Sequence, residues 1–460
     1  MHKTCQRGSL VRTLGKYKVI MQPPTDLLSE AFSVLDTNAR WGYTQPAPDL
    51  YPHQWLWDSC FIAIGLRHRD VFKAKQEILS LLRGQWHNGM LPNIIFSDDT
   101  KYNTDRDLWR SWVSPYAPDN VATTGITQPP VLAEAITRVG EKMTWSDRRP
   151  WFELVYPSLL KYHQWLYHDR DPHDEGLVLQ IHPWEIGMDN TPPWMSELNE
   201  HQLSWWIRLV KETRADNLIN LFRRDTRTIP SKERFATIEA LAMFDIQRRL
   251  RRKAYDIDRI LDHSMFAIED VAFNAILIRN NELLLEIAKS LKEDVPNDLL
   301  ESMAKTKQSF TQLWDPLSNQ FYSRDFITHK LLKTESVSTL LALYAGCISK
   351  DQASQLVHLI NDQHAYGSNY PLPSVPLNSY WYKPTNYWQG PAWVNINWLI
   401  IDGLKRYGFN EEADKLRSST LTMVSSYGCF EYFNPETGEG LGAPYFSWTA
   451  ALAIDLALNA

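Results

Sequence analysis

Residues 51–66 read YPHQWLWDSCFIAIGL, and this stretch contains the pattern on which the fold prediction depends. An aromatic segment that carries one carboxylate, Asp58, is followed at once by an apolar run long enough for a short buried helix. Asp58 could simply cap or begin that helix, but Trp55 and Trp57 beside it favour a residue of a binding site. Because functional side chains concentrate in loops held by a rigid scaffold, the stretch predicts a buried helix with a functional loop at its N-terminal end.

The same pairing of an aromatic loop with a helical run recurs along the chain. Apolar residues at helical spacing predict helices over 26–37, 71–82, 131–139, 151–168, 233–252, 257–281, 283–292, 298–313, 337–345, 391–404, 411–425 and 445–458. Long loops are expected at about 40–60, 96–130, 181–200, 366–391 and 430–445. No βαβ unit or run of alternating strands interrupts this order. We therefore predict an all-α fold whose helical hairpins form a closed ring, with the loops gathered at one end around one cavity.

The chain shows no linker that would divide it into separate domains. A poorly ordered lead-in is expected over residues 1–22, and residues 23–460 are expected to form a single domain in spite of their length. Many of the 19 tryptophans cluster in a few segments instead of scattering, and this clustering indicates one aromatic-lined cavity.

The charge balance and the cysteines restrict the classes of function. With a net charge of -6, the chain has no basic surplus to displace counterions from nucleic-acid phosphates, and the basic run at 248–253 is typical of a solvated helix face. Cys5, Cys60, Cys347 and Cys429 have neither zinc-ligand nor disulfide-framework spacing. No segment has the roughly 20 apolar residues of a membrane span, and the N-terminus lacks the apolar core of a secretory signal. We expect a cytoplasmic protein that binds no metal, cofactor, nucleic acid or membrane, and a homo-oligomer is compatible with this composition.

Residues 182–194, HPWEIGMDNTPPW, form the central aromatic loop. Because proline interrupts both helices and buried strands, its prolines predict a shaped loop through which no helix runs. Its two tryptophans offer flat apolar faces beside the polar atoms of Asp189 and Asn190. A sugar needs that combination, since its C–H faces stack on indoles while its hydroxyls form hydrogen bonds. The alternative is a proline-rich surface turn whose tryptophans only fill the core.

Five motifs together resemble glycoside hydrolase family 63, in particular its bacterial mannosylglycerate and glucosylglycerate hydrolases. They are WLWDS at 55–59, TQPP at 127–130, HPWEIGMDNTPPW at 182–194, NYWQGPAWVNINWL at 386–399 and FEYFNPETGEGLGAPYFSWTAA at 430–451. Because they occur in order over nearly the whole chain, they are more specific together than any one alone. The resemblance implies an (α/α)6 barrel with long loops on the active-site face, inverting hydrolysis of an α-glycoside, and no redox cofactor.

The resemblance also assigns roles to individual residues. Asp189, in GMDN, matches the general acid, and Glu431, in FEYFNP, matches the general base. The positions that line the sugar pocket in the family match Trp55, Trp57, Asp58, Gln128, Trp184, Gly187, Tyr387, Trp388, Gln389 and Trp393. Inverting hydrolysis requires a protonated carboxyl beside the leaving oxygen and an ionised carboxylate across the ring. Two residues from distant parts of the chain suit that geometry, and nearby tryptophans would keep the acid protonated by desolvating it.

Three other carboxylates lie close to this pair in the sequence. Glu185 is spaced one helical turn from Asp189, but a carboxylate that braces the loop is the favoured interpretation. Glu436 and Glu439 belong to a turn-rich stretch, PETGEG, and are expected to be exposed. Asp189 and Glu431 therefore remain the predicted pair.

The aglycone side of the site departs from the family pattern. Glycerate-active relatives carry a basic residue shortly after GMDN, where this chain continues with Thr191 and two prolines. They also tend to have tyrosines in the stretch where this chain reads Arg234-Phe235 and then Ile238. A desolvated glycerate carboxylate needs a cation or a hydrogen-bond donor. The candidate cations are Arg106, Arg110, Arg234 and Lys383, each of which is also compatible with an ordinary surface charge.

We predict an inverting α-glycoside hydrolase that acts on a small α-glucoside or α-mannoside, such as glucosylglycerate or mannosylglycerate. A cavity covered by the segments 96–120 and 195–235 suits a small substrate better than a polymer. The alternatives are an α-glucosidase for a neutral disaccharide, a non-catalytic sugar-binding relative, and a helical scaffold whose aromatic loops anchor protein partners.

Overall fold

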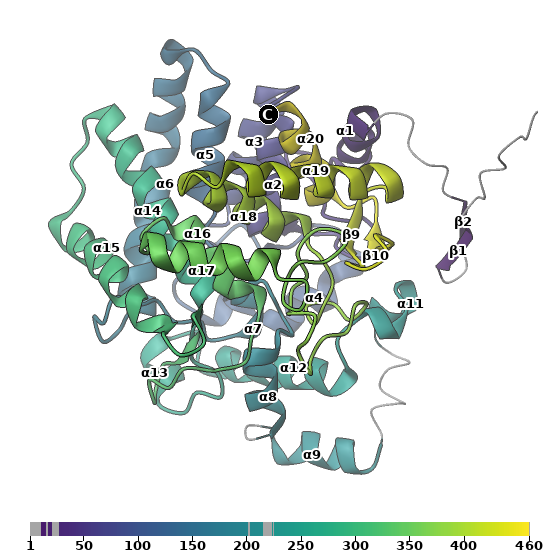
Figure 1. Cartoon of the computed structure of the whole chain (residues 1–460). Helices are drawn as coiled ribbons and strands as arrows, with labels where there is room; N and C mark the ends of the chain where they lie inside the picture. The colour runs from purple at the N-terminus through teal and green to yellow at the C-terminus, as the bar shows by residue number, and fades with distance from the viewer. Residues whose placement is uncertain are drawn as a thin grey trace, which may run out of the picture.

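The computed structural model describes residues 11–14, 17–20, 27–200, 203–214, 223 and 225–459. This part of the chain is rich in helices, and its strands are short (Figure 1). Most of the predicted lead-in lies outside the described residues. Its two described pieces pair as antiparallel strands, β1 (Val11–Leu14) with β2 (Tyr17–Ile20).

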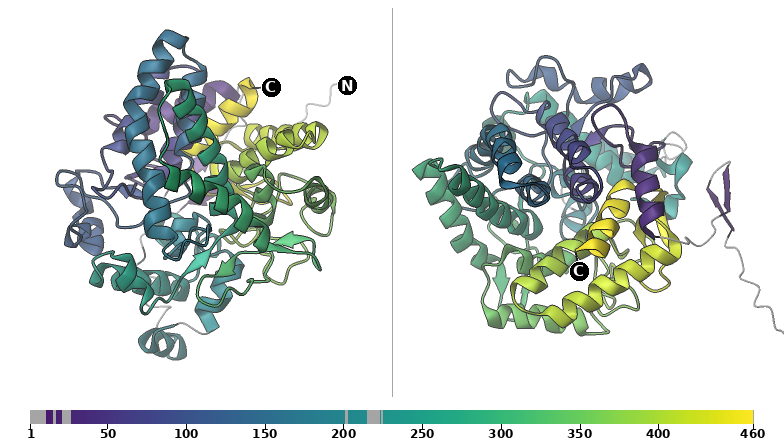
Figure 2. Two further views of the ribbon diagram at one scale, coloured as in Figure 1. Left: turned by 90° about the vertical axis from the view of Figure 1, so that its left-hand side faces the viewer. Right: turned by 90° about the horizontal axis from the view of Figure 1, so that it is seen from above.

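An inner set of helices has most of its residues buried. It consists of α2 (Leu56–Leu66), α5 (Leu132–Glu141), α14 (Val271–Leu291), α16 (Ala342–Ala345), α18 (Val394–Arg406) and α20 (Ser447–Leu458). Every residue of α2 is buried, as expected for a helix without a polar face. Each inner helix packs on the next one in chain order, and α20 packs back on α2. Seen from above, these helices surround a common centre (Figure 2, right).

A second set of helices covers the first. α1 (Leu27–Asn38) packs on α20, α3 (Val71–Leu82) on α2, α6 (Trp145–Arg170) on α5 and α14, α15 (Asn297–Phe310) on α14, and α19 (Asn410–Tyr427) on α18. These helices bury one face only; α3, for example, buries Ala74, Ile78 and Leu81, which recur at helical spacing. The described helices therefore form two layers. α17 (Lys350–Asn361) is a further helix, outside the helices predicted from the sequence.

Short elements fill the loops between these helices. The strands pair antiparallel: β3 (Gln54–Trp55) with β4 (Ile94–Ile95), β5 (Ile268–Glu269) with β8 (Arg324–Asp325), β6 (Trp314–Asp315) with β7 (Gln320–Phe321), and β9 (Phe430–Phe433) with β10 (Gly440–Pro444). The remaining helical segments are η1 (Thr100–Tyr102), α4 (Asn103–Trp109), η2 (Ser111–Val113), α7 (Pro183–Ile186), α8 (Pro192–Glu200), α9 (Trp205–Glu212), α11 (Asp225–Thr228), η3 (Ser231–Glu233), α12 (Thr237–Arg252), α13 (Ile257–Leu261), η4 (Thr311–Leu313) and η5 (Val337–Leu341).

Several predicted boundaries require correction. The helix predicted over 71–82 is confirmed, whereas the one predicted over 257–281 is divided into α13 and α14 by a segment that contains β5. The segment 96–130 is not irregular throughout, because it contains α4. The loop predicted at about 430–445 is largely a β-hairpin, whose strands β9 and β10 pair through Phe433 and Gly440. The glycines and prolines of this segment are typical of turns, and they therefore predict a loop and not strands.

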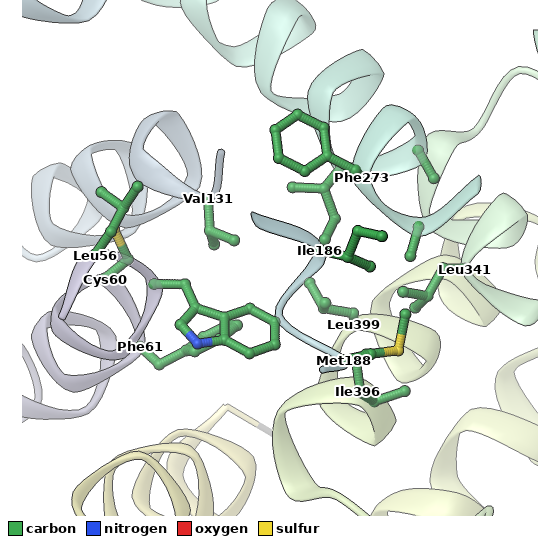
Figure 3. Close-up of a cluster of buried hydrophobic side chains, with 14 of the residues drawn as sticks. Leu56, Cys60, Phe61, Val131, Ile186, Met188, Phe273, Leu341, Ile396 and Leu399 are labelled. Atoms are coloured by element: carbon green, nitrogen blue, oxygen red, sulfur yellow. The ribbon is translucent and has the colours of Figure 1, made fainter. Parts of the chain in front are cut away.

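The central loop is also more regular than predicted. Its two consecutive prolines begin α8 instead of preventing a helix, because proline is tolerated in the first turn, where its missing N–H has no intrahelical partner. Only residues 187–191 separate α7 from α8. Ile186 and Met188 anchor this turn, since both point into the core among residues of α2, α14 and α18 (Figure 3). The turn that carries Asp189 is therefore fixed at the centre of the helices.

Within the described ranges, Cys60, Cys347 and Cys429 are free thiols. The same residues contain no group of three or more His, Cys, Asp or Glu side chains that could hold a metal ion. None of the described helices combines the length and the apolar character needed to cross a membrane.

Candidate active site

A cavity opens where the N-terminal ends of inner helices meet the aromatic loops, and it holds about 610 Å³ of empty space when its solvent-filled mouth is included. Both predicted catalytic residues, Asp189 and Glu431, line it. So do most of the residues predicted to contact sugar, namely Trp55, Trp57, Asp58, Gln128, Trp184, Gly187, Tyr387 and Trp388. Side chains separated by up to several hundred positions in the sequence thus meet in one space.

Two of the predicted sugar contacts, Gln389 and Trp393, do not line this cavity. Trp393 lies behind Trp388, with the two ring planes stacked at a centroid distance of 3.7 Å, and its indole N–H donates to the carbonyl of Tyr387 at 3.1 Å. The Gln389 side chain is buried and donates to the carbonyl of Asn190 at 3.0 Å. Both residues therefore support the wall and do not form its surface.

Other residues line the cavity that the sequence analysis did not assign to the sugar pocket. They are Pro46, Tyr51, Arg234, Phe235, Phe446 and Trp448. Tyr51 opens the same aromatic stretch as Trp55, and Trp448 belongs to the last family motif, so proximity to assigned residues was an available signal for both. The sequence marks Arg234 only as a candidate cation, and nothing in the sequence around Pro46 indicates a role.

Asp189 sits in the short turn between α7 and α8. The turn requires Gly187, whose φ of 77° is left-handed and whose Cα faces the Trp57 ring so closely that a Cβ would lie 2.7 Å from it. The Tyr387 hydroxyl donates to Asp189 Oδ2 at 3.4 Å. Burial raises the pKa of Asp189 to about 7, although Arg234 and Tyr387 act to lower it. A carboxyl with that pKa keeps much of its proton near neutral pH, as a general acid must.

Glu431 lies on β9 in a different environment. Its carboxylate accepts hydrogen bonds from the Tyr51 hydroxyl at 2.8 Å, the Ala443 N–H at 3.0 Å and Arg234 Nη1 at 3.2 Å. Burial raises the pKa of Glu431, while these same three donors lower it by stabilising the charged form. These donors, one of them a cation, offset part of the effect of burial and so help to keep the carboxylate form, which a general base requires.

Arg234 is the one basic residue that lines the cavity within the described part of the chain. Its guanidinium contacts Glu431 and Asp225, and its Cζ lies 4.2 Å from the centroid of the Tyr387 ring. The other candidate cations, Arg106, Arg110 and Lys383, do not line this cavity. Arg234 is only 5% exposed, so the cavity wall contains a buried positive charge.

The remaining carboxylates fall into two groups. Asp58 lines the cavity from the first turn of α2, and burial raises its pKa well above the ordinary value. Glu185 lies outside the cavity and braces the loop, because it accepts from Arg170 at 2.8 Å and from the Ile181 N–H at 2.8 Å. Glu436 is exposed, and neither it nor Glu439 lines the cavity.

The chain is similar over most of its length to proteins of one family. The model of the mannosylglycerate hydrolase MGH1-like glycoside hydrolase domain matches residues 51–449. The mannosylglycerate hydrolase of Thermus thermophilus is 37% identical over 430 residues, which are 92% of this chain and 99% of that protein. The glucosylglycerate hydrolase of Mycolicibacterium hassiacum is 32% identical over 447 residues, which are 94% of this chain and 98% of that protein.

A solved structure is similar to the whole fold. It is the crystal structure of a GH63 mannosylglycerate hydrolase from Thermus thermophilus in complex with Tris and D-glycerate. The two folds match with a TM-score of 0.83 and 36% sequence identity, and the match covers 94% of this chain and 99% of the other.

Proposed function

The chain belongs to the mannosylglycerate hydrolase MGH1-like family of glycoside hydrolases and is a glycosidase, and we propose that it hydrolyses a small α-glucoside or α-mannoside of glycerate with inversion at the anomeric carbon. The observation that supports this most strongly is that Asp189 and Glu431 face one cavity with different partners: burial raises the pKa of Asp189 to about 7, whereas Glu431 is held by three donors, one of them Arg234. The two non-enzymatic alternatives, a sugar-binding relative and a helical scaffold, are set aside because the family is one of hydrolases.

In the proposed reaction, the two carboxyl groups divide the proton transfers between them. Asp189 gives its proton to the glycosidic oxygen as the bond from that oxygen to C1 breaks. Glu431 takes a proton from a water molecule whose oxygen bonds to C1 from the opposite face. The products are the aglycone alcohol and a free sugar of inverted configuration, and exchange with solvent restores both carboxyl groups.

The sugar is proposed to occupy the aromatic part of the cavity. Trp55, Trp57, Trp184 and Trp388 offer faces for its C–H groups. Asp58 and Gln128 offer acceptors and donors for its hydroxyls, and Gly187 lets the chain approach closely. These roles follow the family resemblance, and the placement of the residues around one cavity supports them.

Arg234 is the proposed partner of the glycerate carboxylate. A guanidinium that is largely removed from water can form a short, two-pronged contact with a carboxylate. One observation favours the second candidate, a neutral α-glucosyl disaccharide: Glu431 and Asp225 already lie within contact of Arg234 and balance its charge.

Comparing glucosylglycerate with its uncharged glycerol analogue separates these two candidates. Glycerate recognition predicts a kcat/KM that is at least about tenfold higher for the acid, since a charge-assisted contact contributes about 1.5–3 kcal/mol. Arg234→Met should reduce that ratio. The matched control, Lys383→Met, removes a cation that does not line the cavity and should leave the ratio unchanged. Equal rates on the two compounds in the wild-type enzyme would remove glycerate from the proposal and retain a general α-glucosidase.

The stereochemical outcome tests the assignment of Glu431 as a base. An inverting pair has its carboxyl groups about 6.5–9.5 Å apart, which leaves room for water, whereas a retaining pair is about 5–5.5 Å apart. Proton NMR during early turnover of an α-glycoside is expected to show release of the β-anomer. Release of the α-anomer would instead assign Glu431 as a nucleophile.

We also propose that the inner helices, each packed on the next and the last on the first, close an (α/α)6 barrel. The packing of α20 on α2 supports closure, since it brings the two ends of the series together. The single domain predicted over residues 23–460 remains part of this proposal.

A further inference from the structure

Two buried amides join the turn that carries Asp189 to the loop that carries Tyr387. Asn190 Oδ1 accepts the backbone N–H of Trp388 at 3.0 Å. In the opposite direction, Gln389 Nε2 donates to the backbone carbonyl of Asn190 at 3.0 Å. Asn190 and Gln389 are 0% and 1% exposed, so water does not compete for these two hydrogen bonds. We call this reciprocal pair of contacts the amide clamp.

The amide clamp lies beside a strained residue. Tyr387 has a φ of 41°, a left-handed conformation that is unfavourable for a bulky side chain. Such strain persists only where the surroundings determine the conformation strongly. Gln389 supplies part of that constraint, because its backbone N–H donates to the Asn386 carbonyl at 2.8 Å and its side-chain Oε1 accepts from Asn386 Nδ2 at 3.2 Å. The conformation of Tyr387 therefore depends on the residues that follow it.

We propose that Asn190 and Gln389 are positioning residues that hold the Tyr387 hydroxyl on the Asp189 carboxyl. Neither lines the cavity, so they act through Tyr387 and Asp189 and not by contact with substrate. The proposal assigns a function to Gln389, which the family resemblance had placed among the sugar contacts. It rests on the proposed role of Asp189 as the general acid.

Loss of the amide clamp should change how Asp189 works in two ways. First, a carboxyl displaced from the glycosidic oxygen protonates it less effectively, and a misplacement of about 1 Å can cost about 100-fold in rate. Second, the Tyr387 hydroxyl lowers the pKa of Asp189, so release of Tyr387 should raise that pKa and move the alkaline limb of the pH–rate profile to higher pH.

Gln389→Met tests these expectations, because methionine has nearly the same length but neither donates nor accepts strongly. We expect kcat for an alkyl α-glucoside to fall about 10- to 100-fold. The rate on α-glucosyl fluoride should fall less than about threefold, because fluoride departs without a proton from the general acid. The alkaline limb for the alkyl glucoside should move to higher pH. If Gln389→Met does not fold, Gln389→Glu is the second variant. An ionised glutamate still accepts from Asn386 but cannot donate to Asn190, so the rate on the alkyl glucoside should again fall more than the rate on the fluoride.

Asn397→Leu is the matched control. Asn397 also makes a reciprocal pair of hydrogen bonds, to the N–H and carbonyl of Leu372 at 3.0 and 3.3 Å, and so holds the other end of the loop over 366–391. It also donates to the Trp393 carbonyl at 2.8 Å but does not contact Asp189 or the Tyr387 hydroxyl, so any loss should be equal for both substrates and the alkaline limb should not move.

The outcomes distinguish this inference from the function on which it rests. If Gln389→Met reduces both rates equally and leaves the alkaline limb in place, the amide clamp is only structural and the inference is overturned. If Asp189→Asn itself fails to spare α-glucosyl fluoride, the general-acid role is overturned. The inference is supported if Gln389→Met and Asp189→Asn each lose mainly the rate on the alkyl glucoside, and if the loss in the double variant is smaller than the product of the two single losses. Both changes then act on the same step.

Discussion

The turn that carries Asp189 and the hairpin that carries Glu431 place two buried carboxyl groups in one cavity, yet they provide very different surroundings. Asp189 receives one side-chain hydrogen bond, from the neutral Tyr387 hydroxyl at 3.4 Å. Glu431 receives a hydroxyl, a backbone N–H and a guanidinium, all within 3.2 Å. Burial alone raises the pKa of both groups, so the number and charge of the donors decide which group keeps its proton.

The two surroundings differ because of the elements that supply them. Ile186 and Met188 fix the turn in the core (Figure 3), and Asp189 on this turn accepts from the Tyr387 hydroxyl. A hairpin brings its second strand alongside the first, and the N–H of Ala443 therefore points at Glu431. Arg234 approaches the same carboxylate from just before α12. The proposed division into acid and base thus follows from placing one carboxyl in a tight turn and the other in a hairpin.

The largest expected effect is the loss of either carboxyl group. Asp189→Asn and Glu431→Gln should each reduce kcat for an alkyl α-glucoside about 10²–10⁴-fold, the range typical of general acid–base catalysis. Only Asp189→Asn should spare a substrate with an activated leaving group, since Glu431 is needed for every leaving group. Steady-state rates on the two substrates measure this, with circular dichroism to establish folding. Near wild-type rates for either variant would mean that its role is misassigned.

The sequence predicted the helices of this fold better than the loops between them. Apolar residues at helical spacing located α3 at its observed bounds, because one buried face imposes that spacing. The β9–β10 hairpin carried no such signal, since both of its strands are almost wholly buried and the second begins with glycine. Most of the residues that the family motifs assigned to the site do line the cavity. They meet there because the loops that carry them lie at the same ends of neighbouring helices.

Which residues of a motif face the cavity could not be read from the sequence. Trp388 lines the cavity while Gln389, the next residue, points behind the wall, and their positions depend on the left-handed backbone of Tyr387. Arg234 lies far from every family motif along the chain and reaches the cavity only through the packing of the segment before α12. These placements depend on tertiary contacts, and local patterns do not specify tertiary contacts.

A second prediction concerns the stability cost of the acid. Because burial raises the pKa of Asp189 from 3.8 to about 7, its protonated form stabilises the fold at low pH. That stabilisation is complete below the unfolded-state pKa and is lost as pH rises through the folded-state value. Asp189→Asn removes this dependence. The unfolding free energy of the variant minus that of the wild type should therefore increase by about 2–3 kcal/mol from pH 5 to pH 8.

Urea denaturation at the two pH values measures that gain. Asp49→Asn, which removes an exposed carboxylate, controls for the change in net charge and should show no comparable gain. If Asp189→Asn instead changes the unfolding free energy by the same amount at pH 5 and at pH 8, Asp189 is not held protonated by its surroundings.

The smallest expected effect is on the base, through Tyr51. Its hydroxyl donates to Glu431 at 2.8 Å and lowers the pKa of that carboxyl, so Tyr51→Phe should raise the pKa of Glu431. Because the base must be ionised, the acid limb of the pH–rate profile should move to higher pH by about one unit, which is about a tenfold lower rate at pH values below the limb. Tyr43→Phe, which removes a hydroxyl that donates to the Pro52 carbonyl outside the cavity, is the matched control and should leave the limb in place. A shift of the alkaline limb in Tyr51→Phe, with no shift of the acid limb, would reverse the assignment, because it would mean that the group held by Tyr51 acts as the acid. The comparison between turn and hairpin would then hold as geometry, but the roles of acid and base would be exchanged.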